Sequence, residues 1–339
     1  MPTYVFPSSA TLKTIEQTKI AQMTNDGDPI WSIFPMTTED TDTIMWEQMD
    51  NYVGLQALRG LNGQPRRVAT VGANRYIMRP GVYGEHMPIL EDEMTRRRRF
   101  GTFNEPVDIS DLVMGRQDQL LTRRLNRIRK IGWDLITLGY FTNTTDDGTV
   151  AHTDAYVQRT FTSTVLWSTA ATSTPLADFR AVKLLQRGYS MSLGSQATAY
   201  MNQTTFNYLT VNTNAADLGG KRTSGLATII GLADTNKVLL QEDLPQIQIY
   251  EGGYLDDNGV WQLHLPTGTV IVVGRRTTGA SLGRYIMTRN VNNPGFAPGA
   301  YTKVITKDDE VPLAVEVHDG HNGGPALEFP SAIIKMNVA

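Results

Sequence analysis

The strongest pattern of apolar and polar positions lies between residues 107 and 141. Apolar side chains recur there at helical spacing and form one stripe: Leu121, Leu125, Ile128 and Leu135. Basic side chains fall on roughly the opposite face: Arg116, Arg123, Arg127 and Lys130. The pattern predicts a helix from Ile109 to Phe141, about 50 Å long at ~1.5 Å per residue. Such a helix needs support along its whole length, which a small compact domain seldom provides.

The chain before this helix carries weaker patterns. Residues 9–23, SATLKTIEQTKIAQM, predict a short helix with Ser9 as its N-cap. The residues around it are loop-like, so 1–54 is interpreted as an N-terminal arm. Residues 55–103 alternate turn signals with short β-like runs, which predicts a long two-stranded excursion with little core of its own. Loops of this length without regular secondary structure usually have a functional role or contact a partner.

After the long helix the pattern changes twice. A hairpin turn is predicted at 146–149, DDGT, and two helices at 174–188 and 197–212. From Thr228 onward the reading is mostly β, and the six candidate strands are 246–252, 260–266, 269–274, 283–291, 300–306 and 330–338. Helices and strands that do not alternate regularly indicate an α+β fold and not a doubly wound sheet.

Charge is unevenly distributed along the 339 residues. The formal net charge of −3 gives no overall basic field for nucleic acid. Between Arg59 and Lys130, however, there are 15 basic and 8 acidic residues. Arginine dominates the basic set, and no lysine occurs between Lys19 and Lys130. This asymmetry favours an interaction surface, although a solvated face is the commoner explanation.

The remaining composition narrows the class of protein. There is no cysteine, so disulfides and thiolate metal sites are excluded. The first residues lack the basic and apolar segments of a signal peptide, and no apolar run is long enough to span a bilayer. We expect a soluble protein, made inside the cell and without a membrane partner.

No group of residues predicts catalysis. His318 and His321 stand in a glycine-rich stretch that suggests an exposed turn, and His264 alternates with apolar residues like a strand residue. The acidic clusters at 91–93, 256–257 and 308–310 read as solvated turns. Residues 274–284 are glycine-spaced and basic but lie between strands, so they are a weak phosphate site. We therefore expect no enzyme, no catalytic residue, no cofactor and no metal site.

Four consecutive arginines, Arg96 to Arg99, leave several interpretations open. In an extended strand their side chains would alternate, so both faces would be cationic and neither could lie on a core. The row would then contact solvent or other chains, and the acids at 91–93 are the nearest candidate partners. The alternative is a sequence-independent nucleic-acid-binding protein that uses the basic segment 59–130. An enzyme with an unrecognised α+β fold is a more distant one.

The order of short motifs resembles a known family. Residues 250–274, YEGGYLDDNGVWQLHLPTGTVIVVG, combine a strand, an Asn-Gly hairpin and an apolar strand, and GRYIMTR follows. Residues 174–188 and 200–212 are similar to the family's two middle helices, and 323–339 to its closing strand. The chain resembles the major capsid proteins of tailed bacteriophages, in particular the lambda-type major capsid protein E family with the Hong Kong 97-type fold.

This resemblance implies a division of the chain. The expected parts are an N-terminal arm (1–54), an extended loop that overlaps a neighbouring subunit (55–103), a peripheral domain with its spine helix (104–171, helix 107–141), an axial domain around capsomer centres (172–305) and a return to the peripheral domain (306–339). Residues expected to contact a neighbouring subunit are the charged ones of the loop: Arg66, Arg67, Arg75, Arg79, Glu91, Asp92, Glu93, Arg96, Arg97, Arg98 and Arg99. Those expected to face DNA are Arg116, Arg123, Arg127 and Lys130.

The resemblance also implies a function and partners. Many copies would form hexamers and pentamers of an icosahedral head shell, assembled in the host cytoplasm and present in the virion, around double-stranded DNA bound without sequence preference. A portal protein, a scaffolding protein and a decoration protein are the further expected partners. The scaffolding protein is expected to be separate, because some relatives carry it as a long N-terminal segment and only about 50 residues precede the loop here. Some relatives cross-link from a lysine on this loop, which here contains none. Noncovalent contacts should therefore hold the shell.

Overall fold

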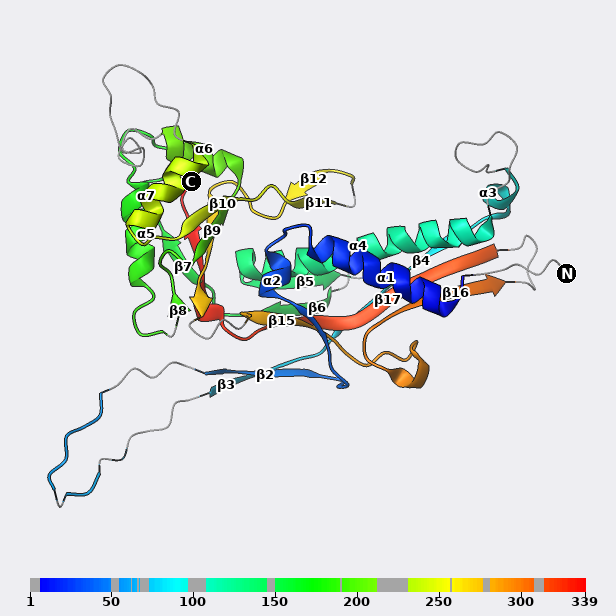
Figure 1. Cartoon of the computed structure of the whole chain (residues 1–339), viewed down its shortest axis with the longest axis horizontal. Helices are drawn as coiled ribbons and strands as arrows, with labels where there is room; N and C mark the ends of the chain where they lie inside the picture. The colour runs from blue at the N-terminus through cyan, green and yellow to red at the C-terminus, as the bar shows by residue number, and fades with distance from the viewer. Residues whose placement is uncertain are drawn as a thin grey trace. The chain divides into compact units, whose positions relative to one another are not determined.

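The computed structural model describes most of the chain (Figure 1). The described residues are 7–49, 55–61, 63–65, 67, 73–96, 108–144, 150–189, 191–211, 231–256, 258–276, 281–307 and 314–339. They form two compact units: unit 1 contains 1–44, 77–132 and 284–326, and unit 2 contains 45–76, 133–283 and 327–339. Each unit draws on separated segments, so neither is a continuous stretch of sequence.

Unit 1 places helices on one face of a sheet. Its helical elements are α1 (Ser9–Thr24), α2 (Ile30–Ile33), α3 (Glu91–Arg96), most of α4 (Ile109–Leu138) and the 3-10 turn η2 (Pro294–Phe296). Its strands are β1 (Met36–Thr38), β4 (Gly81–Ile89), β15 (Gly283–Met287), β16 (Ala300–Lys307) and β17 (Ala314–Leu327). The sheet runs β1-β15-β17-β16, with β4 also paired to β17.

Strand β17 organises this sheet because it has neighbours on both sides. It pairs antiparallel with β16, from Ala314↔Lys307 to His321↔Ala300, and antiparallel with β4, from Val315↔Ile89 to Gly323↔Gly81. Side chains alternate across a strand, so Val315 and Val317 lie on one face with Asp319 and His321. This face packs against α4 and α1 through a core of Leu12, Ile89, Leu112, Val113, Leu120, Val315 and Val317.

The long helix is confirmed, with one difference at its end. α4 spans 30 residues, or about 45 Å, and its predicted apolar stripe is buried. It stops at Leu138 because Gly139 adopts a left-handed φ of 80°, and β5 begins at Tyr140. Within the helix, Gly132 lets α2 approach closely, since a Cβ there would lie 2.8 Å from Ile30 Cγ1.

Unit 2 is built on a second five-stranded sheet in the order β10-β9-β13-β18-β7. These strands are β7 (Arg159–Thr162), β9 (Thr198–Met201), β10 (Gln246–Ile249), β13 (Thr269–Val273) and β18 (Ile333–Asn337). Its helices are α5 (Pro175–Leu184), α6 (Gln203–Val211), α7 (Leu232–Gln241) and the turn η3 (Pro330–Ala332). Buried residues of the sheet and of α5, α6 and α7 share one apolar core.

Shorter antiparallel pairs complete unit 2. They are β2 (Ile44–Met49) with β3 (Ala73–Met78), β5 (Tyr140–Thr144) with β6 (Val150–Ala155), β8 (Met191–Ser192) with β14 (Arg275–Arg276), and β11 (Gly253–Leu255) with β12 (Trp261–Leu263). The first pair flanks only the part of the predicted excursion (55–103) that precedes β3; the rest of that segment contains β3 itself, β4, which pairs with β17 in the sheet of unit 1, and α3. The hairpin turn expected at 146–149 lies outside the described residues, between β5 and β6.

The α+β class is confirmed, and most candidate strands are present. The helix predicted at 197–212 is wrong in its first part: Thr198–Met201 is the strand β9, buried between β10 and β13. The helix begins after Asn202, whose Oδ1 accepts a hydrogen bond from the Thr205 backbone N–H at 2.8 Å. Helix α7 falls in the region interpreted as mostly β, and α1 takes Ser8, not Ser9, as its N-cap.

Candidate functional site

The residues expected to contact a neighbouring subunit lie in three different places. Arg66 and Arg97, Arg98 and Arg99 are outside the described residues. Arg67 is on the exposed excursion, Arg75 on β3 and Arg79 between β3 and β4, all with exposed side chains. Glu91, Asp92, Glu93 and Arg96 form α3. The structure therefore separates them into the excursion and the short helix before α4.

Arg96 is not part of a strand. It is the last residue of α3, and its Nε lies 2.8 Å from Asp92 Oδ1, one helical turn earlier. Both side chains are exposed. The alternation argued for an extended arginine row is thus wrong for this residue, because its backbone is helical and its charge is paired within the chain.

The basic face of α4 is partly neutralised. Arg116 forms an ion pair with Glu93 of α3, and Arg123 a two-pronged ion pair with Glu85 of β4. The Arg123 guanidinium holds the pKa of the Glu85 carboxyl below its usual range. Arg127 is exposed and Lys130 is half-buried. The four residues expected to face DNA therefore lie on one helix, but two of them already meet carboxylates.

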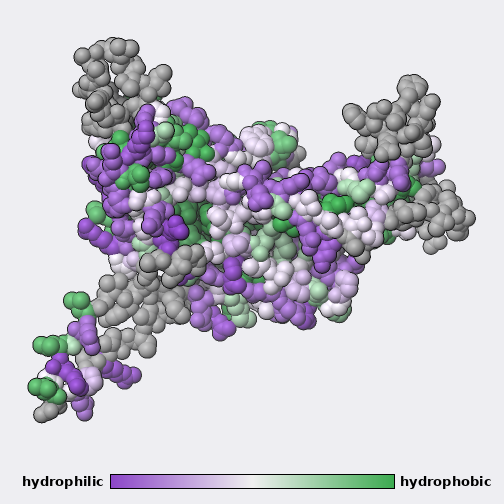
Figure 2. Space-filling model, viewed as in Figure 1, coloured by the Kyte–Doolittle hydropathy of each residue, from purple (hydrophilic) through white to green (hydrophobic). Residues whose placement is uncertain are grey.

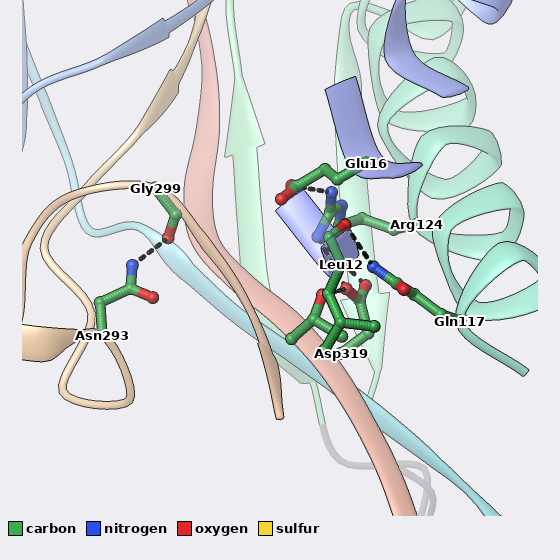
Figure 3. A network of polar contacts seen from close by, with 8 residues as sticks. Leu12, Glu16, Gln117, Arg124, Asn293, Gly299 and Asp319 are labelled. Carbon is green, nitrogen blue, oxygen red and sulfur yellow. Dashed lines mark hydrogen bonds and ion pairs between the residues drawn. The ribbon is translucent and has the colours of Figure 1, made fainter. Parts of the chain in front are cut away.

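A buried polar network connects α1, α4, β16 and β17 of unit 1 (Figure 3). Arg124 Nη1 donates to both carboxylate oxygens of Asp319, at 2.9 and 3.2 Å, and Arg124 Nη2 pairs with Glu16 of α1. Thr302 Oγ1 of β16 donates to Asp319 Oδ1 at 2.9 Å. Gln117 Nε2 donates to the Leu12 carbonyl oxygen at 2.8 Å. These bonds fasten α1, α4 and the sheet to one another.

The sequence contained a signal for this network. Arg124 stands three residues after Leu121 and four before Ile128, so it falls on the apolar stripe of α4 and not on the basic face. A charge on a buried stripe requires a buried partner. Its partner, Asp319, could not be identified from sequence because 318–324, HDGHNGG, was interpreted as a loop.

Burial shifts the ionisation of the residues on this face of β17. Burial raises the pKa of Asp319 to about 6, against the opposing effect of Arg124. His321 is fully buried, stacks on Tyr83 at 4.9 Å, and has its Nε2 2.9 Å from the Tyr285 hydroxyl. Burial, with Arg124 nearby, lowers the pKa of His321 to about 3. His321 is therefore neutral at pH 7, where Asp319 is ionised.

The expectation of two exposed turn histidines is wrong. His318 and His321 both lie in β17, on opposite faces of the sheet, because they are three residues apart in a strand. His318 is half-buried, its Nε2 lies 3.0 Å from Glu316 Oε2, and its ring stacks on His86 of β4 at 5.1 Å. His264 is buried among Trp133, Tyr250 and Tyr254 in unit 2, as expected of a structural histidine.

The excursion between β2 and β3 exposes apolar side chains that the sequence reading passed over. Leu55, Leu58 and Leu61 are all fully exposed. Figure 2 shows the described part of this segment with hydrophobic atoms on its surface, beside hydrophilic ones. Scattered exposed leucines are ordinary; these three recur at every third position of one segment, which makes the segment a candidate contact surface.

Two further observations concern membrane insertion and metal binding. Among the described helices, none is long and apolar enough to cross a bilayer. Within the same described ranges, no three His, Cys, Asp or Glu side chains gather closely enough to hold a metal ion.

The chain is similar to known proteins in both sequence and structure. The sequence model of the family phage major capsid protein E matches residues 31–318. A prophage capsid protein from E. coli CFT073 has a similar structure, with a TM-score of 0.58 and 14% identity over 95% of this chain and 98% of that one. No protein with curated functional information matches the sequence.

Two more solved structures are less similar. A phage-related protein from Bordetella bronchiseptica RB50 gives a TM-score of 0.49 at 12% identity over 96% of this chain and 97% of that one. The capsid of a native GTA particle gives 0.49 at 10% identity over 100% and 94%. The fold assignment depends on the first structure, and it is the Hong Kong 97-type capsid fold expected from the sequence.

Proposed function

The chain belongs to the phage major capsid protein E family and forms the icosahedral head shell of a phage from many copies of itself, and we propose how its surfaces serve that shell. The family match over residues 31–318 carries this conclusion. The alternative of a nucleic-acid-binding protein is not favoured. Family membership implies a structural protein and not an enzyme.

We propose that the excursion between β2 and β3 overlaps a neighbouring copy. The supporting observation is the full exposure of Leu55, Leu58 and Leu61. Contact with a neighbouring copy would remove their apolar surface from water, which is favourable. Arg67, Arg75 and Arg79 would surround this apolar contact with charge, as a polar rim surrounds the core of most interfaces. The other charged residues of 55–103 keep their expected role in subunit contact, with Arg96 acting together with Asp92.

We propose that packaged double-stranded DNA meets the basic face of α4. The exposed Arg127 and the half-buried Lys130 would add to Arg116 and Arg123, whose charges are partly compensated by Glu93 and Glu85. Contact through so few cations would be weak for each subunit and independent of sequence. The shell would nevertheless accumulate many such contacts.

The remaining parts of the proposal concern organisation and partners. We propose hexamers and pentamers, and the division into arm, extended loop, peripheral domain and axial domain at the boundaries 1–54, 55–103, 104–171, 172–305 and 306–339. A portal protein, a separate scaffolding protein and a decoration protein complete the set of partners. Assembly would take place in the host cytoplasm, before the shell becomes part of the virion.

One experiment tests the central proposal. The chain is expressed alone and together with the neighbouring late genes, and the products are analysed by negative-stain microscopy and by size exclusion at several salt concentrations. Shells, tubes or capsomers are expected. A stable monomer that binds DNA with a steep dependence on salt would contradict the proposal and support the nucleic-acid alternative.

A further inference from the structure

The loop between β15 and β16 has an unusual composition for this protein. From Asn290 to Thr302 there is no charged residue, although 19% of the chain is charged. Phe296 and Val291 are 55% and 73% exposed on this loop. Interfaces between proteins are depleted in charge at their centres and enriched in aromatic side chains. The composition is therefore that of an interface, on a segment that contributes no residue to the apolar core of unit 1.

The loop is also held in one conformation. Asn293 Nδ2 donates to the Ala297 carbonyl oxygen at 3.0 Å and to the Gly299 carbonyl oxygen at 3.4 Å, the second of which is drawn in Figure 3. The buried Asn290 accepts from the Asn292 backbone N–H at 2.9 Å through its Oδ1. At the base, Asn322 Nδ2 of β17 donates to the Arg289 carbonyl oxygen at 2.9 Å. These hydrogen bonds fix the conformation of the loop and attach its base to β17.

Within this hydrogen-bonded loop, Phe296 has a backbone conformation that phenylalanine rarely adopts. Its φ is 57°, next to Gly295 at 65°. A left-handed backbone is unfavourable for a bulky L-residue, and more than half of the Phe296 side chain stays exposed. A glycine or asparagine at 296 would satisfy the same turn with less strain. The chain thus holds an aromatic ring in water at a fixed position, which is how a preformed binding anchor behaves.

The position of the loop on the sheet defines the surface around it. Thr302 faces Asp319 beneath α4, so its neighbour Lys303 is on the opposite face, where its Nζ lies 3.4 Å from Asn292 Oδ1. The loop therefore lies on the face of the sheet away from α4 (Figure 1). Two other apolar side chains on that face are exposed, Val82 of β4 and Ile305 of β16.

We propose that the loop Asn290–Gly299 is a contact between subunits in which Phe296 packs against a second copy of this chain. The inference rests on the shell-forming function. Around a symmetry axis, identical residues of several copies approach one another, and like charges there would repel. The loop itself carries no charge and so has no such repulsion; of the two cations at its base, Arg289 is paired with Asp40 at 2.7 Å, and the Lys303 ammonium contacts Asn292. One lysine beside an uncharged loop gives no cationic face for DNA, which favours a second copy as the occupant.

A photochemical experiment identifies the occupant. Phe296 is replaced by photoreactive benzoylphenylalanine, and shells produced together with the neighbouring late genes are irradiated and analysed on denaturing gels. A covalent product of two copies of the 37.6 kDa chain is expected. A product with a different protein, or intact shells without any product, would overturn the inference but not the shell-forming function. If the unaltered chain forms no shell, the proposed function fails first.

A substitution separates binding from folding. Phe296→Asn keeps a residue that tolerates a left-handed φ, so the unassembled chain should unfold at the same or a higher denaturant concentration. The concentration needed for assembly should rise by about ten-fold, the loss of one interface anchor. Val157→Asn changes a still more exposed apolar side chain in unit 2, 85% against 55% for Phe296, and serves as the control. Equal assembly of the Phe296→Asn and Val157→Asn variants would mean that the ring has no partner in the shell.

Discussion

Arg124 and Asp319 are 195 residues apart in the sequence, and in unit 1 a single guanidinium nitrogen of Arg124 bonds both oxygens of the Asp319 carboxylate. Both side chains are almost completely buried. Arg124 also reaches Glu16, and Asp319 also accepts from Thr302. The pair therefore connects an N-terminal helix, the long helix and the central strand, which are encoded in three distant parts of the chain.

Removal of Arg124 should destabilise the chain strongly. Arg124→Met leaves a carboxylate buried without its counter-charge, and the free energy of unfolding should fall by about 3–5 kcal/mol. Arg123→Met is the matched control on the same helix, because its pair with Glu85 is exposed and should contribute only about 0.2–1 kcal/mol. Denaturant unfolding of the unassembled chain measures both. Equal effects of the two substitutions would show that burial does not distinguish the pairs.

The double variant should be less damaged than the sum of its parts. Arg124→Met with Asp319→Leu removes both charges of this pair and leaves two apolar side chains, while Glu16, which also pairs with Arg124, keeps its charge. A buried ion pair replaced as a whole costs much less than a broken one. A double-mutant cycle should therefore give a coupling of at least about 1 kcal/mol. Additive effects would exclude a direct interaction of this strength.

The pH dependence of unfolding should reveal two opposing groups. Asp319 has a pKa of about 6 in the folded chain, above its ordinary 3.8, so its contribution to stability is full below pH 3.8 and is lost as the pH rises through 6. His321 has a pKa of about 3, below its ordinary 6.5, so its contribution is full above pH 6.5 and is lost as the pH falls toward 3. Between pH 4 and 6 the two slopes, each about 1.4 kcal/mol per pH unit, should nearly cancel.

Single substitutions should expose each slope. Asp319→Asn should leave a chain that loses stability steeply on acidification from pH 6 to 4, and His321→Gln one that gains stability over the same range. Urea unfolding at a series of pH values gives both slopes. Parallel curves for the two variants would contradict the assignment. Asp92→Asn, on the exposed helix α3, is the control for a change of net charge.

Two glycines of α4 should respond to alanine in opposite directions. A Cβ at Gly132 would lie 2.8 and 3.0 Å from two atoms of Ile30, whereas at Gly115 it would meet no atom within 4 Å. Gly115→Ala should therefore stabilise the chain by up to about 1 kcal/mol through helix propensity. Gly132→Ala should destabilise it by about 1–3 kcal/mol, as overpacking does. Thermal unfolding of both variants, and rescue of Gly132→Ala by Ile30→Ala, test the contact.

The exposed leucines should affect assembly and not folding. Serine at Leu55, Leu58 and Leu61 should raise the concentration needed for shell formation by an order of magnitude or more, since each buried leucine contributes about 1.5–3 kcal/mol. Leu255→Ser, at an exposed leucine in unit 2, is the control. Light scattering during assembly measures the threshold. An unchanged threshold in the triple variant would remove the excursion from the subunit contact.

Assembled particles should show only the monomer on denaturing gels. The segment 55–103 contains no lysine, so it lacks the amine that a lysine-to-asparagine cross-link requires. Mass spectrometry of the dissolved shell gives the same information. A ladder of covalent multimers would mean that a lysine elsewhere supplies the nucleophile.

Some elements were predictable because a single strong pattern specifies them. The stripe of α4 and the apolar strand Thr269–Val273 are examples, since both are buried on the faces that their spacing indicates. β17 was not predictable, because its glycines and histidines read as a turn. Its strand conformation depends on β4 and β16, which supply hydrogen bonds on both sides. Pairing with distant segments therefore decided the conformation of β17 against the local turn propensity of its residues.

The charged residues of the candidate site were harder to interpret. A sequence shows that Arg116 and Arg123 share a helix face, but not that Glu93 and Glu85 approach that face. It likewise shows leucines at 55, 58 and 61 without showing that all three are exposed. Whether a side chain is neutralised or exposed depends on contacts between segments far apart in the chain, which periodicity does not encode.

Helix α1 is attached to the rest of unit 1 mainly by polar bonds, so its detachment should differ thermodynamically from global unfolding. Among its described side chains only Leu12 is buried, and polar bonds from Gln117, Arg124 and Asp118 to Leu12, Glu16 and Lys19 fasten it to α4. Its detachment would expose little apolar surface, so that opening would have a small heat-capacity change and a small m-value. Amide hydrogens of α1 should then exchange through a local opening. Salt would weaken the partly exposed Lys19–Asp118 pair, whereas the buried Arg124–Glu16 pair would be screened much less and would keep α1 attached to α4.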